Sequence, residues 1–211
     1  MGGTIDGNAR IGGTRSAPQI TFDLRGRDIR SSALAAAGVS TLAVSANGST
    51  DGNALNLNGE ITSPEGVRAN VQGSVPLNGS QMDLNIALRS FPLAVLNRHV
   101  PNQNLGGTLT GTAKIGGTTS SPTAQFNIQG RGLTALQLTE LGIAPLSLEA
   151  AGSYVNDRVQ LTSLRADGPA GLNLTASGTI PVAGNGLSVS ARGTIPLTLG
   201  NRLLIDRGTQ L

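Results

Sequence analysis

Apolar and polar residues alternate with a period of two along most of the chain. Successive side chains of a β-strand point to opposite faces, so this alternation predicts a series of half-buried strands. One face of the predicted strands is almost purely aliphatic, and the other carries Asn, Ser, Thr, Arg and Asp. The residues expected on the apolar face are Ile11, Ile20, Phe22, Leu24, Leu55, Leu57, Val67, Val71, Leu84, Ile86, Leu109, Ile115, Phe126, Ile128, Leu146, Leu148, Val159, Leu161, Leu172, Leu174, Leu187 and Val189.

Turn residues separate these runs. Gly52-Asn53 and Asn78-Gly79 have the composition of tight turns between strands. Asn47-Gly48-Ser49 matches the N-glycosylation acceptor pattern and is interpreted as another turn. Two segments lack the alternation: residues 29–39 are expected to form a loop or one short helix, and residues 91–100 a short helix or irregular crossing.

The chain contains an internal repeat. Residues 2–26 and 106–130 share two Gly-Gly-Thr triplets, a Pro, a Phe and a closing Gly at the same spacing. Further matches at the same offset, some shifted by one residue, pair Gly38 with Gly142, Leu42 with Leu146, Leu57 with Leu161, Gly73 with Gly178, Phe91 with Ile195 and Asn97 with Asn201. The sequence therefore predicts two tandem units of about 104 residues, 2–104 and 105–211, in one continuous sheet.

An aliphatic strand face must be covered, and the pattern leaves two solutions open. One is a closed solenoid or sandwich whose apolar faces pack together, which alternation alone favours. The other is an open or folded-over antiparallel sheet with an apolar trough for a ligand. The aromatic content of 2%, the long repeat and the small uncharged polar side chains favour the second solution.

Composition excludes several functional classes. The 15 basic residues are all Arg except Lys114, and they are scattered, so no nucleic-acid patch is expected. The absence of Cys rules out disulfides and thiolate metal sites. His99 is the single histidine, and no nucleophile elbow or phosphate loop is present, so we expect no enzymatic activity, catalytic residue, metal or cofactor. No apolar run is long enough to span a membrane, and the start has no signal-peptide pattern. We therefore expect the chain to be a piece of a longer protein.

The repeated motif resembles a known family. Gly-Gly-Thr-Leu-Thr-Gly-Thr-Ala-Lys-Ile-Gly-Gly-Thr, from residue 106, together with the preceding Pro92-Leu93-Ala94-Val95-Leu96-Asn97, is similar to the C-terminal region of the TamB family of AsmA-like bacterial envelope proteins. The resemblance covers essentially all of the chain, in two copies.

This resemblance implies a fold and a function. It implies an all-β fold, an elongated, concave, mostly antiparallel sheet called a β-taco, whose apolar trough carries phospholipid acyl chains between the inner and outer membranes. The apolar residues named above would line that groove. It further implies the periplasm of a Gram-negative bacterium, an inner-membrane anchor in the full-length protein, and an outer-membrane barrel partner of the TamA/BamA type in outer-membrane protein assembly. Free sheet edges of the chain would also permit self-association. A filled β-solenoid acting as an adhesin or scaffold is the alternative.

Overall fold

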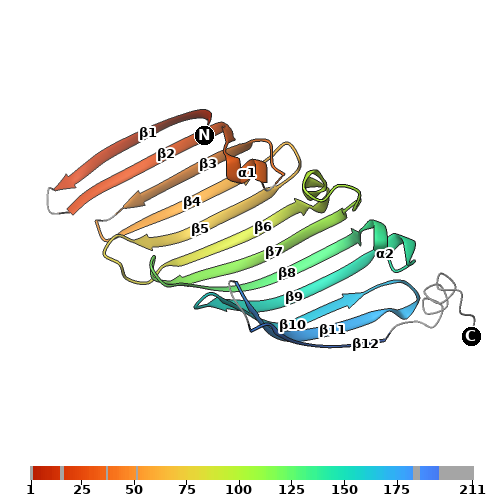
Figure 1. Ribbon diagram of the computed structural model, residues 1–211. Helices are drawn as coiled ribbons and strands as arrows, with labels where there is room; N and C mark the ends of the chain where they lie inside the picture. The colour runs from red at the N-terminus through yellow and green to blue at the C-terminus, as the bar shows by residue number, and fades with distance from the viewer. Residues whose placement is uncertain (1, 15–16, 37, 51, 183–185, 195–211) are drawn as a thin grey trace, which may run out of the picture. The chain divides into compact units, whose positions relative to one another are not determined.

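The computed structural model describes residues 2–14, 17–36, 38–50, 52–182 and 186–194, and the fold is all-β (Figure 1). The described strands form one twelve-stranded sheet in which every strand hydrogen-bonds to the strands before and after it in sequence. The predicted all-β antiparallel sheet is confirmed, and this strand order is that of a meander, with hairpin connections, and not of a solenoid.

The elements follow a similar order twice, with a 3₁₀ turn added between β10 and β11 in the second set. The first set is β1 (Gly2–Thr14), β2 (Ala17–Arg30), α1 (Ser32–Ala36), β3 (Leu42–Thr50), β4 (Ala54–Thr62), β5 (Arg68–Pro76), β6 (Asp83–Pro92) and the 3₁₀ helix η1 (Leu93–Arg98). The second set is β7 (Gly106–Gly117), β8 (Pro122–Thr134), α2 (Leu136–Glu140), β9 (Leu146–Val155), β10 (Arg158–Asp167), the 3₁₀ turn η2 (Pro169–Gly171), β11 (Asn173–Pro181) and β12 (Ser188–Thr194).

Residue contacts divide the chain into two compact units. Unit 1 comprises Met1–Phe91 and Thr110–Phe126, and unit 2 comprises Pro92–Leu109 and Asn127–Leu211. Strands β1 to β5 thus lie in unit 1 and β9 to β12 in unit 2, whereas β7 and β8 contribute a part to each. The sequence repeat of residues 2–104 and 105–211 is a different division of the chain, and it stays a prediction.

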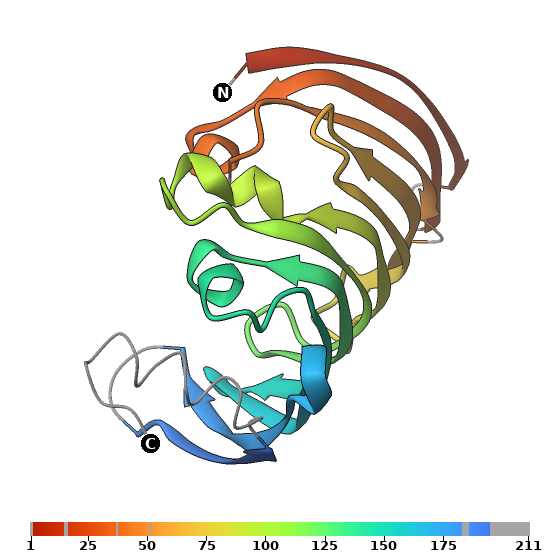
Figure 2. The ribbon, with the colours of Figure 1, turned by 90° about the vertical axis from the view of Figure 1, so that its right-hand side faces the viewer.

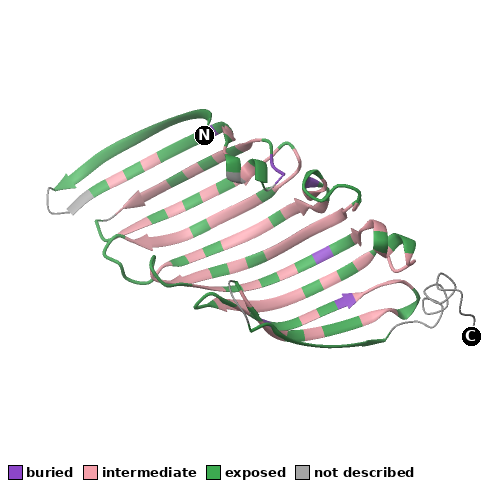
Figure 3. Ribbon diagram, in the orientation of Figure 1, coloured by how far each residue is buried: buried purple, intermediate pink, exposed green. Residues whose placement is uncertain are grey.

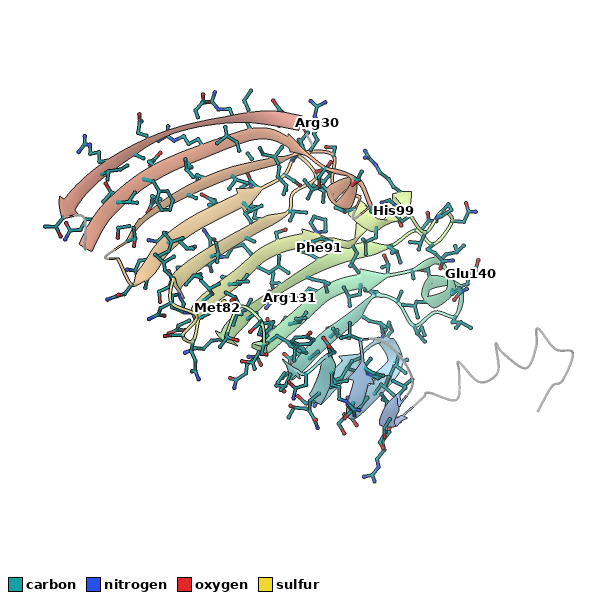
Figure 4. The ribbon with its side chains drawn as sticks, turned by 60° about the vertical axis from the view of Figure 1, so that its left-hand side comes forward. Arg30, Met82, Phe91, His99, Arg131 and Glu140 are labelled. Atoms are coloured by element: carbon teal, nitrogen blue, oxygen red, sulfur yellow. The ribbon has the colours of Figure 1, made fainter. Side chains whose placement is uncertain are left out.

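Strand alternation produces the expected two-faced strands. Along β3 the half-buried residues Leu42, Val44 and Ala46 alternate with the exposed Ala43 and Ser45. The same alternation continues along β4 and the middle of β8, whereas β1 and β12 are exposed throughout (Figure 3). Side chains accordingly project from both faces of the strands (Figure 4).

The two segments that lack alternation form short helices. Among the described residues of 29–39 the helical part is α1, and it lies beside the ends of β2 and β3 (Figures 1 and 2). Within residues 91–100 the first two residues still belong to β6, and η1 follows from Leu93 to Arg98. No described helix is long and apolar enough to cross a membrane.

Two expectations about turns have different outcomes. Asn78-Gly79 is a turn between β5 and β6, with φ of +77° at Gly79 and the Asn78 side-chain oxygen accepting the Ser80 N–H. The interpretation of Asn47-Gly48-Ser49 as a turn is wrong, because these residues lie inside β3. Gly48 occurs there because it faces Phe22 on the neighbouring strand, where a larger side chain would not fit.

Few side chains are deeply buried. Among the described residues the buried hydrophobic side chains are Val39, Val95, Leu161 and Ala166, and no side chain is fully buried. Ordinary domains bury most large aliphatic side chains in a common core. Here most aliphatic residues of the strands are only partly buried or exposed, and Leu161 and Ala166 in β10 are the buried ones among the described strands.

Candidate apolar ligand-binding face

The strand register of unit 1 brings the predicted apolar residues onto one face. Directly opposed residues on neighbouring strands share a face, so each row of partners runs across the sheet. Three such rows are Ile11–Ile20–Thr50–Leu55–Val75, Ala9–Phe22–Gly48–Leu57–Gly73–Leu84 and Gly7–Leu24–Ala46–Gly59–Val71–Ile86. We call this surface the unit 1 apolar face.

Unit 2 has an equivalent surface. Its rows are Leu148–Ala166–Leu174–Gly193, Ala150–Leu164–Ala176–Ala191 and Gly152–Leu161–Gly178–Val189. A β-bulge in β10 shifts the alternation, because two residues, Thr162 and Ser163, lie between Leu161 and Leu164. We call this surface the unit 2 apolar face.

Most of the predicted lining residues lie on these strands, with three exceptions. Val67, Leu172 and Leu187 each precede a strand, at the starts of β5, β11 and β12. The lining residues predicted on β7 and β8 are half-buried, namely Leu109, Ile115, Phe126 and Ile128, and of these Phe126 and Ile128 alternate with exposed neighbours. In unit 2, Leu109 lies close to Gly130, together with Leu133.

Glycines form part of the apolar faces, which the sequence did not indicate. A Cβ at Gly48 would come within 2.6 Å of Cζ of Phe22, and one at Gly59 within 3.0 Å of Cγ1 of Val71. These glycines leave room for a bulky side chain that leans across from the adjacent strand. The side chains of the apolar face therefore pack against the adjacent strand of the same sheet, and their outer surface stays accessible.

The exposure of these residues defines what the faces can do. Leu55, Leu57, Leu84 and Ile86 are half-buried, and Ile11 near the edge of the sheet is 78% exposed. Exposed aliphatic surface gains about 25 cal/mol for every Å² that a ligand removes from water. A strip of such side chains, without directed polar groups, favours flexible hydrocarbon over a ligand that needs hydrogen bonds.

The opposite face of unit 1 is polar. One row across it consists of exposed amide and carboxylate side chains, Asn8–Asp23–Asn47–Asn58–Gln72–Asn85. Nearby ion pairs join Arg25 to Asp23 at 3.7 Å and Lys114 to Asp83 at 3.4 Å. Exposed ion pairs contribute little to stability, so these two pairs mainly keep this face charged and hydrated.

The polar side of unit 2 carries an arginine–aspartate pair at the end of β10. Arg165 donates to Asp167 at 2.7 Å, and Asn173 donates to the same carboxylate at 2.6 Å. The hydrogen bond from Arg165, followed by that from Asn173, lowers the pKa of Asp167 below its ordinary value. A shallow, open hollow of about 440 Å³ lies beside Arg165, and its lining mixes Arg165, Arg192 and small polar residues with Leu164 and Ala176.

Glu65 fastens the segment after α1 to the β4–β5 turn. Its Oε1 accepts the Ser40 backbone N–H at 2.9 Å, next to the buried Val39. Hydrogen bonds from Ser40, and a further one from Ser63, lower the pKa of Glu65 to about 2. The carboxylate therefore stays ionised and holds this connection at the end of the unit 1 strands.

Asn97 makes a comparable clamp in unit 2. Its side-chain oxygen accepts the Leu105 N–H at 2.7 Å, and its side-chain nitrogen donates to the Leu105 carbonyl at 2.9 Å. Both polar groups of Leu105 are thus satisfied by one amide on η1, which fixes the approach of the chain to β7.

The described part of the chain holds one histidine and no cluster of metal-ligating side chains. His99 is exposed at the end of η1, where its backbone N–H donates to the Leu96 carbonyl (Figure 4). No group of three or more His, Asp or Glu side chains gathers among the described residues.

Comparison with known proteins assigns the chain to no family. No family model matches the chain, no curated protein matches it, and no solved structure matches it at a significant level.

Proposed function

We propose that the chain is a lipid-conduit segment in which the apolar face of each unit holds phospholipid acyl chains. The observation that carries this proposal is the pair of aliphatic faces that are in register across their strands but only half-buried. In this role the chain binds lipid without catalysing a reaction and needs no cofactor.

The energetics of an acyl chain support this role. Each methylene transferred out of water gains about 0.8 kcal/mol, so a lipid exposed in water carries a large penalty. An aliphatic strip removes that penalty at each position by a similar amount, which lets the lipid slide. An aromatic pocket would instead bind one pose tightly. The scarcity of aromatic residues, 2% of the chain, therefore suits a conduit.

The resemblance to the TamB family supplies the setting of the proposal. The conduit would lie in the periplasm, between inner and outer membranes, as part of a longer anchored protein. An outer-membrane barrel of the TamA/BamA type would be its partner, in lipid supply or in outer-membrane protein assembly. The alternative of a filled β-solenoid gains no support, because the strands follow a meander and bury few of their aliphatic residues.

Two adjacent arginine substitutions test the proposal. Leu84 is half-buried on the unit 1 apolar face, whereas Asn85 is exposed on the polar face of the same strand. A charge on the apolar face opposes hydrocarbon, so Leu84→Arg should weaken binding of a fluorescent-acyl phosphatidylethanolamine by about tenfold or more. Asn85→Arg should bind like the unmodified chain, with both variants melting cooperatively. Equal binding by the two variants, or unfolding caused by Leu84→Arg alone, would contradict the proposal.

A further inference from the structure

The two edges of the sheet concentrate exposed apolar side chains. Among the described residues, β1 pairs with β2 alone and β12 pairs with β11 alone. Ile5 and Ile11 on β1 are 70% and 78% exposed, and Leu187, immediately before β12, is 69% exposed. An edge strand with unpaired backbone groups and exposed aliphatic residues is a template for another strand.

The β6–β7 pair shows which kind of strand fits such an edge. By the repeat, β7 corresponds to β1 and β6 corresponds to β12. The Met82 N–H donates to the Gly117 carbonyl at 2.7 Å, and in an antiparallel ladder such a bond sets the two residues opposite each other. This register places Leu84 opposite Ile115 and Ile86 opposite Ala113, so that the apolar residues share a face.

We propose that the chain associates head to tail with a second copy of itself, β12 of one copy pairing antiparallel with β1 of the next. Val189 occupies the position in unit 2 that Leu84 occupies in unit 1, since each lies opposite a glycine, Gly178 or Gly73. Transferring the β6–β7 register therefore sets Leu187 opposite Gly13, Val189 opposite Ile11 and Ala191 opposite Ala9.

Charges at the two edges fit the same register. In the β6–β7 pair, Asp83 lies opposite Gly116 and forms an ion pair with Lys114, two residues earlier on the neighbouring strand. The same diagonal step across the proposed junction brings Arg192 beside Asp6. Both residues are exposed, and neither belongs to the three ion pairs among the described residues. The junction thus buries edge aliphatics on one face and pairs opposite charges on the other.

Proline substitutions at the two edges test the association. In the proposed register the N–H groups of Ala9 and Ala191 point away from β2 and β11, so proline there removes docking bonds and spares the internal ladders. Sedimentation velocity over a concentration series should show the unmodified chain forming dimers and longer species, as a head-to-tail contact does not close. Ala9→Pro alone and Ala191→Pro alone should stay monomeric, whereas their equimolar mixture should form dimers.

Charge reversal at Asp6 and Arg192 tests whether β12 of one copy pairs with β1 of the next. Asp6→Arg alone and Arg192→Asp alone should each weaken association by about fivefold, and both reversals in one chain should restore it. A monomeric unmodified chain at all concentrations would overturn the proposal. Three other results would overturn it too: self-association of either proline variant alone, no dimer in their mixture, or no restoration by the double reversal. A competing contact between β1 of one copy and β1 of another, for example, would need neither β12 nor Arg192.

Discussion

Single residues determine how the side chains of the apolar faces pack while the faces remain accessible. Gly48 accommodates the ring of Phe22, and Gly59 accommodates Val71, so large side chains rest on the neighbouring strand instead of on a second layer. Glu65 fixes the connection between α1 and β3, because its carboxylate in the β4–β5 turn accepts the Ser40 N–H. Both devices stabilise the sheet from within.

The lowered pKa of Glu65 predicts a pH-dependent contribution to stability. Its ordinary pKa of 4.5 falls to about 2 in the folded chain, so its contribution is present above pH 4.5 and is lost as the pH falls toward 2. Glu65→Gln should lower the free energy of unfolding by about 1 kcal/mol at pH 7, and the difference should vanish near pH 2. Urea unfolding at several pH values measures this. The matched change Glu60→Gln, at an exposed strand position, should not show that trend. A deficit for Glu65→Gln that stays constant from pH 7 to pH 2 would contradict the assignment.

At the scale of elements, short helices join strands whose ends need fixing. The Asn97 clamp connects η1 to Leu105 and so sets where β7 begins. Val95, on the same helix, is one of the few buried hydrophobic residues among those described. The 3₁₀ helix η1 therefore fixes the connection to β7 within unit 2, which we call the η1 corner.

Removal of the clamp should loosen that corner. Asn97→Ala leaves the part-buried N–H and carbonyl of Leu105 without their partner, which should lower the free energy of unfolding by about 1 to 3 kcal/mol. Asn97→Asp keeps the acceptor and loses the donor, so its effect should be smaller. Amide hydrogen exchange at Leu105 should accelerate in the alanine variant. An exchange rate unchanged from that of the unmodified chain would show that the clamp does not hold the corner.

Sequence patterns predicted the strands better than their connections. Alternation identifies a strand whenever its face is continuous, as along β3 and β4, because burial on one side enforces a period of two. The bulge in β10 breaks that period, which is why Leu164 and Ala166 were not among the predicted apolar residues. Glu65 and Asn97 act on backbone groups far along the chain, and no local pattern marks such contacts. Gly48 was interpreted as a turn because its tertiary neighbour Phe22 is not visible in a linear motif.

For the whole molecule the proposed function depends on one contrast, between an aliphatic sheet face that would take hydrocarbon and a polar face that would not. Adjacent residues on single strands carry that contrast, with Leu57 beside Asn56 on β4 and Leu84 beside Asn85 on β6. Leu174, which is 40% exposed, represents the unit 2 apolar face. Neighbouring positions on one strand differ in face but hardly in position along the chain, so they serve as internal controls for each other.

Site-specific photo-crosslinking is the most direct test of this contrast. A photoreactive residue at Leu57, Leu84 or Leu174 should acquire the mass of a phospholipid when the chain is irradiated with phospholipid vesicles and analysed by mass spectrometry. The same residue at Asn56 or Asn85 should acquire none. Equal labelling of both faces, or no lipid adduct at the three leucine positions, would contradict the proposal that the apolar faces hold acyl chains.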